Sequence, residues 1–193
     1  MMIHPATVHF AMVLPVVASV FGIVYLINRQ ELFSKISTIL ILFTALAMAG
    51  VWYTGSVAGP EIYDFLSEAG QNTLVQHKEL GLYLAISMGL VALLKIIGCK
   101  VKKFFLEAIA IVALIVITLA TFVQGNMGGE LVYNHGTPFK SFMIMDTLHE
   151  TAEAVNEEDQ DSAKIELYKE ALEDIELIHE EVEIYYGNQA EQE

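Results

Sequence analysis

The sequence predicts an all-α integral membrane protein, an up-down four-helix bundle with an extra C-terminal acidic amphipathic helical segment. Of its 193 residues, 54% are hydrophobic and the mean hydropathy is +0.50, whereas soluble domains have about 45–50% apolar residues. Charge is divided unevenly: residues 1–140 hold 8 basic and 7 acidic residues, and residues 141–193 hold 2 and 17. We therefore expect a four-span transmembrane domain over 1–140 and an acidic tail over 141–193.

Four apolar runs are each long enough to cross the hydrocarbon core, which takes about 20 helical residues. The predicted spans are residues 8–27, 36–57, 80–97 and 104–123. Short connections make consecutive spans antiparallel neighbours, which favours an up-down bundle. Gly55 and Gly59 form a GxxxG pattern that permits close helix packing. Gly125, Gly128 and Gly129 predict that the last helix ends or bends there.

Basic residues predict the orientation of the bundle in the cell (inner) membrane. Six of them flank the connections after the first and third spans: Arg29, Lys35, Lys95, Lys100, Lys102 and Lys103. Lys95 is expected to snorkel to this face, and Glu107 to reach Lys102 or Lys103. The opposite face holds Lys78 and Lys140. The first face should therefore be cytoplasmic, and both termini extracytoplasmic.

The tail is predicted to form two amphipathic helices, over about 142–155 and 162–186, because apolar residues recur there at helical spacing. These helices are expected to form a hairpin or to pack on a partner. The net charge of −15 favours a basic external partner. It excludes nucleic acid, because nucleic-acid binding needs a basic surface.

Histidines are the most informative polar residues, because the predicted topology places all of them outside the cytoplasmic half: His4, His9, His77, His135, His149 and His179. The first four lie at ends of elements that the bundle should bring together. His9 is the better site candidate of the two on the first span, because it lies inside the apolar run. His4 precedes it by five residues, about 140° around a helix, and should be peripheral.

Imidazoles at the mouth of a bundle are common ligands of haem iron, copper and zinc. We expect one b-type haem with His9 and His77 as axial ligands, or a metal ion bound among His4, His9, His77 and His135. The surrounding positions would line the pocket: Thr54, Gly55, Gly59, Gly81, His135 and Tyr133. Soft thioether ligands near this face make copper an alternative ion: Met1, Met2, Met12 and Met127. Such a site would exchange electrons with quinol or an external cytochrome.

A second interpretation makes the chain a non-enzymatic membrane anchor or adaptor, whose acidic tail recruits an external partner. The histidines would then be structural, since interfacial histidines often cap helices or bond a carbonyl. Nucleophile–base pairs and phosphate-binding glycine loops are missing from the sequence, so a stand-alone enzyme is not expected. A transporter is disfavoured because the predicted spans lack charges at mid-membrane.

Three sequence motifs carry a resemblance to a known family. They are His4-Pro-Ala-Thr-Val-His9-Phe10, His77-x-x-x-Gly81, and Gly128-Gly-Glu-Leu-Val-Tyr-Asn-His135-Gly136. Over about residues 1–137 the chain resembles the bacterial membrane family catalogued as domain of unknown function 2231. The resemblance implies four spans with signature histidines at one membrane face. Its members often occur with cytochrome or other redox domains, which implies electron transfer by association. The tail lies outside the resemblance.

Overall fold

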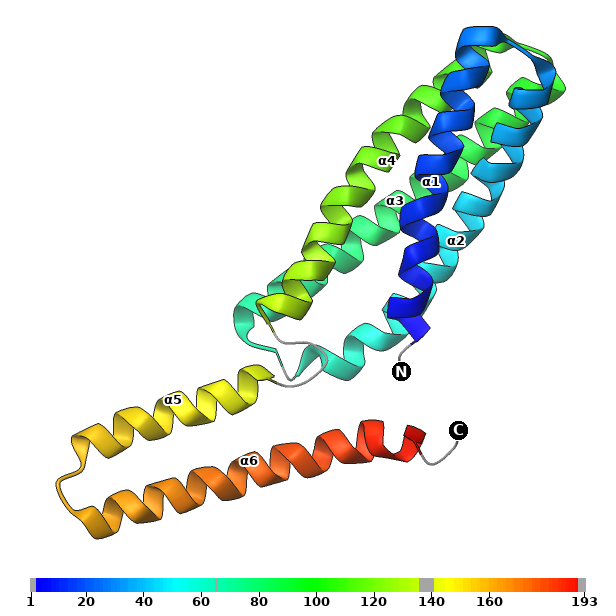
Figure 1. Ribbon diagram of the computed structural model, residues 1–193. Coiled ribbons are helices and arrows are strands. Elements are labelled where there is room, and N and C mark those ends of the chain that lie inside the picture. The colour runs from blue at the N-terminus through cyan, green and yellow to red at the C-terminus, as the bar shows by residue number, and fades with distance from the viewer. Residues whose placement is uncertain (1–2, 65, 136–140, 191–193) are drawn as a thin grey trace. The chain divides into compact units, whose positions relative to one another are not determined.

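The computed structural model describes residues 3–64, 66–135 and 141–190, and these residues form helices joined by short connections (Figure 1). The helices are α1 (Ile3–Asn28), α2 (Glu31–Tyr63), α3 (Glu68–Lys100), α4 (Phe104–Tyr133), α5 (Ser141–Glu157) and α6 (Asp161–Ala190). The all-α prediction is confirmed. The chain divides into two compact units, Met1–Glu61 with Asn72–Gly129 and Ile62–Gln71 with Glu130–Glu193.

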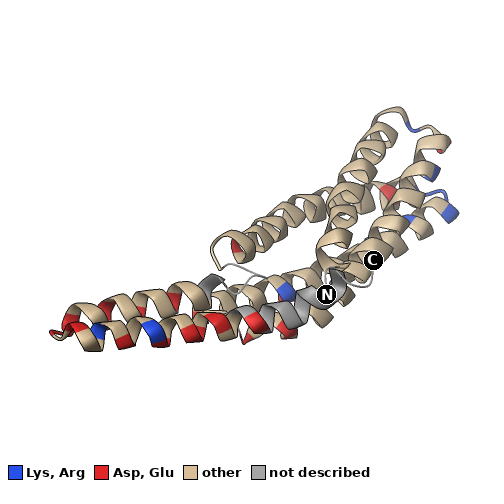
Figure 2. Cartoon of the chain, turned by 60° about the horizontal axis from the view of Figure 1, so that its bottom comes forward, with Lys and Arg blue, Asp and Glu red and all other residues tan. Residues whose placement is uncertain are grey.

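The first unit is a bundle of four long apolar helices, α1 to α4, and the chain is a multi-pass membrane protein. The helices are 26, 33, 33 and 30 residues long and apolar enough to cross a membrane, which takes about 20 residues. Large apolar side chains such as Phe10, Leu46, Leu90 and Val116 point outward. Figure 2 shows these helices almost without charged residues over most of their length.

The bundle interior is marked by small and polar residues at three- and four-residue spacing. In α1 the buried positions include Pro15, Ala18, Gly22 and Tyr25. A Cβ at Gly22 would lie 2.9 Å from the side chain of Ile111, so this glycine lets α1 and α4 approach closely. Small residues favour such contacts in membranes, where packing replaces the hydrophobic driving force.

The glycine-rich exit of the fourth span does not end the helix, so the first of the two predicted outcomes, an end or a bend, is wrong. Helix α4 continues through Gly125, Gly128 and Gly129 to Tyr133. Side chains from other helices fill the space beside two of these glycines: Met12 lies against Gly125 and His77 against Gly128. Interhelical packing therefore stabilises a helix that local propensity alone would interrupt.

The second unit contains the α5–α6 hairpin. Among the hairpin side chains that the structure describes, the buried apolar ones are Val155 on α5 and Ala171 and Ile178 on α6. Ala171 and Ile178 are seven residues apart and so lie on one face of α6. The predicted tail helices over about 142–155 and 162–186 correspond to α5 and α6 within a few residues.

Candidate functional site

His4 contributes an imidazole to the interior at one end of the bundle, which we call the histidine end (His4, Trp52, Thr54, His77 and Gln124). It is half-buried, and its Nδ1 lies 3.1 Å from Thr54 Oγ1 on α2. A Cβ at Gly55 would come within 2.7 Å of the imidazole Cε1. Glycine at position 55 thus makes room for the His4 ring.

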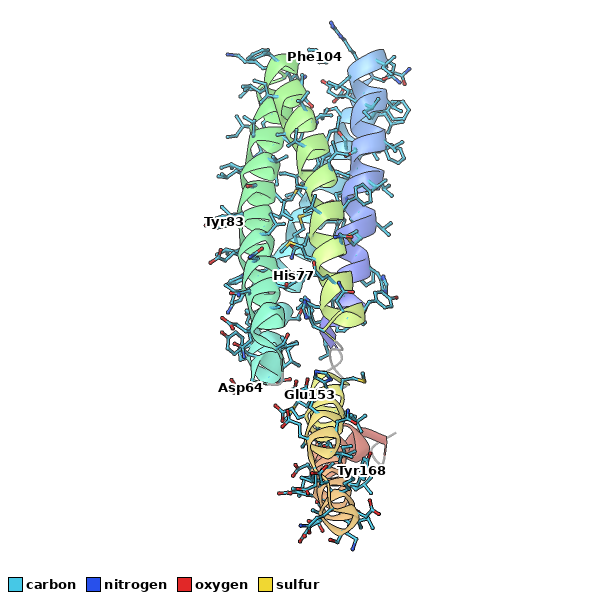
Figure 3. All side chains as sticks on the ribbon, turned by 90° about the vertical axis from the view of Figure 1, so that its left-hand side faces the viewer. Asp64, His77, Tyr83, Phe104, Glu153 and Tyr168 are labelled. Carbon is cyan, nitrogen blue, oxygen red and sulfur yellow. The ribbon has the colours of Figure 1, made fainter. Side chains whose placement is uncertain are left out.

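His77 faces the same interior from α3, in the half of the bundle away from Phe104 (Figure 3). Its main-chain carbonyl accepts a hydrogen bond of 2.8 Å from Gln124 Nε2 on α4. A Cβ at Gly128 would lie 3.3 Å from the imidazole Cε1. His4 on α1 and His77 on α3 therefore face the bundle interior at the same end.

Three buried polar atoms at the histidine end have no hydrogen-bond partner among the described residues: Trp52 Nε1, His77 Nδ1 and Gln124 Oε1. Gly81 connects two of these side chains, because a Cβ there would lie 3.1 Å from Gln124 Nε2 and 3.9 Å from Trp52 Cδ1. Each unpaired buried group costs about 1–3 kcal/mol. A donor, an acceptor and an imidazole nitrogen left unpaired together are typical of a binding site rather than of plain packing.

The two histidines on the first span lie on different faces of α1. His9 is exposed on the outside of the bundle, whereas His4 reaches the interior. Helix α1 already begins at Ile3, so His4 is a helical residue and not a free cap. The angle of about 140° between them allows just one to face the interior, and in the structure this is His4, although His9 lies deeper in the apolar run.

Other residues expected at the site have different surroundings. Gly59 is buried with Leu74 nearby, at 3.9 Å from a Cβ built at the glycine, so it serves helix packing. Tyr133 is 88% exposed. His135 belongs to the second unit, where its ring packs against Gly70 and its Nε2 lies 3.9 Å from Glu130 Oε1.

The tail histidines and the first two methionines do not belong to this cluster. His149 is exposed and lies 3.6 Å from Glu153 through its Nε2. Met1 and Met2 are outside the described residues, as is the side chain of His179. Within the part of the chain that the structure describes, no group of three or more His, Cys, Asp or Glu side chains forms a metal-binding cluster.

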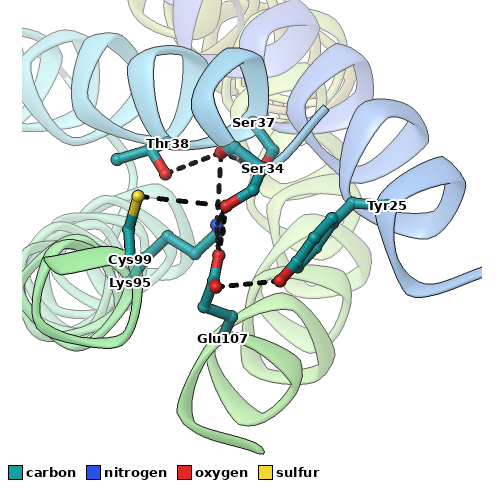
Figure 4. A network of polar contacts seen from close by, with 7 residues as sticks. All are labelled: Tyr25, Ser34, Ser37, Thr38, Lys95, Cys99 and Glu107. Atoms are coloured by element: carbon teal, nitrogen blue, oxygen red, sulfur yellow. Dashed lines mark hydrogen bonds and ion pairs between the residues drawn. The ribbon is translucent and has the colours of Figure 1, made fainter. Parts of the chain in front are cut away.

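A second polar network, at the opposite end of the bundle, joins all four helices (Figure 4). Lys95 Nζ on α3 pairs with the Glu107 carboxylate on α4, and donates to Ser34 Oγ on α2 at 3.1 Å. Tyr25 on α1 donates its hydroxyl to Glu107 Oε1 at 2.8 Å, and Ser34 Oγ also donates to this carboxylate. We call these four residues the lysine-end network.

Sequence reasoning missed this network, and two expectations about it were wrong. Lys95 does not snorkel, because its side chain is fully buried. Glu107 pairs with Lys95 and not with Lys102 or Lys103. A buried ammonium is stable in an apolar bundle when a carboxylate and further hydrogen bonds compensate its desolvation. One feature of the sequence indicates that Lys95 is buried. It lies 18 residues, or five helical turns, after His77 and so on the same face of α3.

The comparisons with known proteins agree with the bundle. The family described as "Predicted membrane protein (DUF2231)" matches residues 1–140, which is most of the chain. The chain therefore belongs to this family. No curated protein and no solved structure matches it.

Proposed function

We propose that this DUF2231 protein binds one soft transition-metal ion, copper before zinc, at the histidine end of its bundle and carries electrons there. The observation that supports the proposal most strongly is that two imidazoles, His4 and His77, face the interior at one end of the bundle. Buried polar atoms without hydrogen-bond partners among the described residues lie at the same end. Two neutral imidazoles are favourable ligands for copper or zinc.

Met12 favours copper. Its thioether Sδ lies 3.4 Å from a Cβ built at Gly125, the residue that follows Gln124 on α4. A thioether in the interior near this end adds a soft donor to the two imidazoles, and soft donors select Cu(I). Because copper alternates between Cu(I) and Cu(II), such a site accepts one electron from a reduced partner and passes it to an oxidised one.

A haem fits the described side chains less well than a single ion. Protein side chains occupy the space beside three glycines at this end of the bundle. His4 fills the position beside Gly55, Gln124 and Trp52 lie beside Gly81, and His77 lies beside Gly128. A compact ligand uses the same donors without displacing these side chains. We therefore propose a metal ion in preference to one b-type haem.

The orientation in the membrane is part of this proposal. Glu107 neutralises Lys95. Five basic residues still flank the end of the bundle that holds the lysine-end network, which we call the lysine end: Arg29, Lys35, Lys100, Lys102 and Lys103. The positive-inside rule then makes the lysine end cytoplasmic. The metal would be bound at the extracytoplasmic face, where an external cytochrome or quinol is the partner class.

The test is a copper titration of purified protein after treatment with a chelator. Binding of one Cu(I) per chain is measured by competition with a chromogenic chelator, for wild type, His4→Ala and His77→Ala. His9→Ala is the matched control, because His9 is an exposed histidine on the same helix as His4. The proposal predicts loss of binding in the first two variants and none in the control.

An absorption spectrum of the protein as isolated distinguishes a copper site from a haem site. A haem Soret band that disappears in His77→Ala would overturn the copper assignment while keeping the site. Equal copper binding by wild type and by a His4→Ala/His77→Ala double variant would overturn the site itself.

A further inference from the structure

The α5–α6 hairpin has a second apolar side in addition to the one it buries. Large apolar side chains stay exposed on both helices: Met145, Leu148, Ile165, Tyr168, Leu172 and Leu177. Tyr168 and Leu172 are 53% and 65% exposed. Exposed apolar side chains that gather on one side mark an interaction surface.

The rotation of 100° per residue shows which of the exposed side chains of α6 share one side of the helix. Taking the buried Ala171 as the direction of α5, Tyr168, Leu172 and Ile165 are rotated by about 60°, 100° and 120° in one sense, at 100° per residue. Leu177 is rotated by about 120° in the opposite sense. The first three therefore form one stripe, and Leu177 lies on the other side of the helix.

The same construction on α5 uses the buried Val155 as reference. Leu148, Ala152 and Met145 are then rotated by about 20°, 60° and 80° in the same sense, and Ala152 is exposed like its neighbours. Because the helices of a hairpin run antiparallel, equal senses of rotation bring both stripes to one side. The apolar side of the hairpin thus consists of Met145, Leu148, Ala152, Ile165, Tyr168 and Leu172.

The charge around this side identifies the kind of partner. Residues 141–193 hold 17 acidic and 2 basic residues, and Figure 2 shows acidic positions recurring along both helices. Glu153 on α5 and Glu176 on α6 are rotated beyond the apolar stripes, by about 160° and 140°, and border them. On α6, Lys169 shares this border at about 160°, and Asp161 lies within the stripe at about 80°. A second copy of this acidic hairpin would be repelled, as would anionic lipid.

We propose that the apolar side of the α5–α6 hairpin binds one amphipathic helix of a partner protein, whose polar positions are lysine and arginine. Two antiparallel helices with a shared apolar side form two thirds of a three-helix bundle, and the partner helix supplies the third. Its apolar face covers Leu148, Tyr168 and Leu172, while its basic flanks meet the acidic border. This proposal is independent of the metal site.

The test uses the full chain in nanodiscs of zwitterionic lipid and a labelled synthetic peptide as probe. The peptide has about 21 residues, three heptads, of leucine and lysine in helical register. Fluorescence anisotropy is measured against empty nanodiscs, which removes the contribution of lipid binding. Wild type is expected to bind the peptide above this background, and to bind it more weakly as salt screens the charges.

Two matched variants locate the binding. Leu172→Glu, on the apolar side, is expected to weaken binding at least ten-fold. Leu177→Glu introduces the same charge at an equally exposed leucine on the other side of α6 and is expected to change it less than two-fold. Circular dichroism confirms that each variant stays helical, and Tyr168→Glu replaces Leu172→Glu if the latter does not. A peptide with glutamate in place of lysine is expected not to bind.

Several results would overturn the proposal. Peptide binding no stronger than to empty nanodiscs removes the site, and equal loss in Leu172→Glu and Leu177→Glu shows non-specific charge attraction. A wild-type dimer that Leu172→Glu converts to a monomer would show that a second copy covers this side instead.

Discussion

Lys95 on α3 and Glu107 on α4 form an ion pair inside the bundle, where the lysine side chain is fully buried and the glutamate side chain is 5% exposed. Only twelve residues separate them, because the connection between the two helices is short. Tyr25 and Ser34 bond to the same carboxylate, so one acidic side chain links all four helices. Helices in lipid associate without a hydrophobic driving force, and this network therefore fixes their relative register.

Replacing Glu107 is expected to destabilise the bundle strongly. Glu107→Gln leaves the Lys95 ammonium buried without a counter-charge, which typically costs about 3–5 kcal/mol. The free energy of unfolding is measured by circular dichroism during titration with a denaturing detergent. Glu31→Gln is the control, because Glu31 and Lys35 form an exposed pair and such pairs contribute less than about 1 kcal/mol.

The double variant Lys95→Met/Glu107→Leu is expected to recover most of the stability that Glu107→Gln loses, because apolar residues of similar size replace buried ion pairs at little cost. A Glu107→Gln variant as stable as Glu31→Gln would contradict the buried pair.

Two glycines of α2 should respond differently to the same substitution. Gly55→Ala would place a methyl group 2.7 Å from the His4 ring and so displace this imidazole. Copper affinity is expected to fall about ten-fold, equivalent to about 1.4 kcal/mol. Gly50→Ala meets no atom within 4 Å and should leave affinity unchanged. Cu(I) competition titrations measure both, and equal affinities would show that the His4 ring does not bind the ion.

Deleting residues 141–193 should leave the bundle folded and inserted in the membrane. The buried apolar residues of the hairpin, Val155, Ala171 and Ile178, belong to the second unit, and the core of the first unit is made by α1 to α4. Membrane fractionation and the thermal unfolding of the purified shortened chain test this. Loss of insertion or aggregation would show that the hairpin is needed to cover the bundle.

The orientation is tested by a reporter fused after Glu193. If the lysine end is cytoplasmic, an even number of spans leaves the C-terminus outside, and a reporter active in the cytoplasm should be silent. Fusion after Arg29, between α1 and α2, should give the opposite signal. Activity of the first fusion together with silence of the second would reverse the orientation and place the histidine end inside.

The four apolar helices and the two acidic tail helices could be predicted from the sequence, because length, hydropathy and charge determine them almost locally. The interior face of α1 could have been predicted as well. Its buried residues Pro15, Ala18 and Gly22 extend back at helical spacing to His4, eleven residues before Pro15 and about 20° from it. His9 is about 120° away. Small and polar residues mark the interior of a membrane bundle. The helical register of a histidine relative to such residues therefore predicts its interior position better than its depth in the apolar run does.

The polar contacts between helices could be predicted less well than the interior faces of the helices. The sequence places Glu107 within reach of Lys95, Lys102 and Lys103, and local spacing favours the nearer lysines. Lys95 becomes the partner of Glu107 because α3 packs against α4 and Gly98 leaves space for the glutamate side chain. A Cβ at Gly98 would lie 2.8 Å from Glu107 Cγ. Similarly, Gln124 and Trp52 could be assigned to the histidine end only after three helices were in place. These contacts depend on tertiary packing and have no local signature.

The separation of the two polar ends has an electrical consequence. His77 and Lys95 share a face of α3 and are 18 residues apart, about 27 Å along the helix axis. Between them the bundle core is made of side chains such as Ile41, Met88 and Leu114, and the hydroxyl of Thr44 is bonded to a carbonyl of its own helix. If the histidine end binds a redox-active ion as proposed, this apolar middle layer separates the ion from the opposite face. An electron accepted there would then leave on the same side of the membrane, and no charge would cross the bilayer.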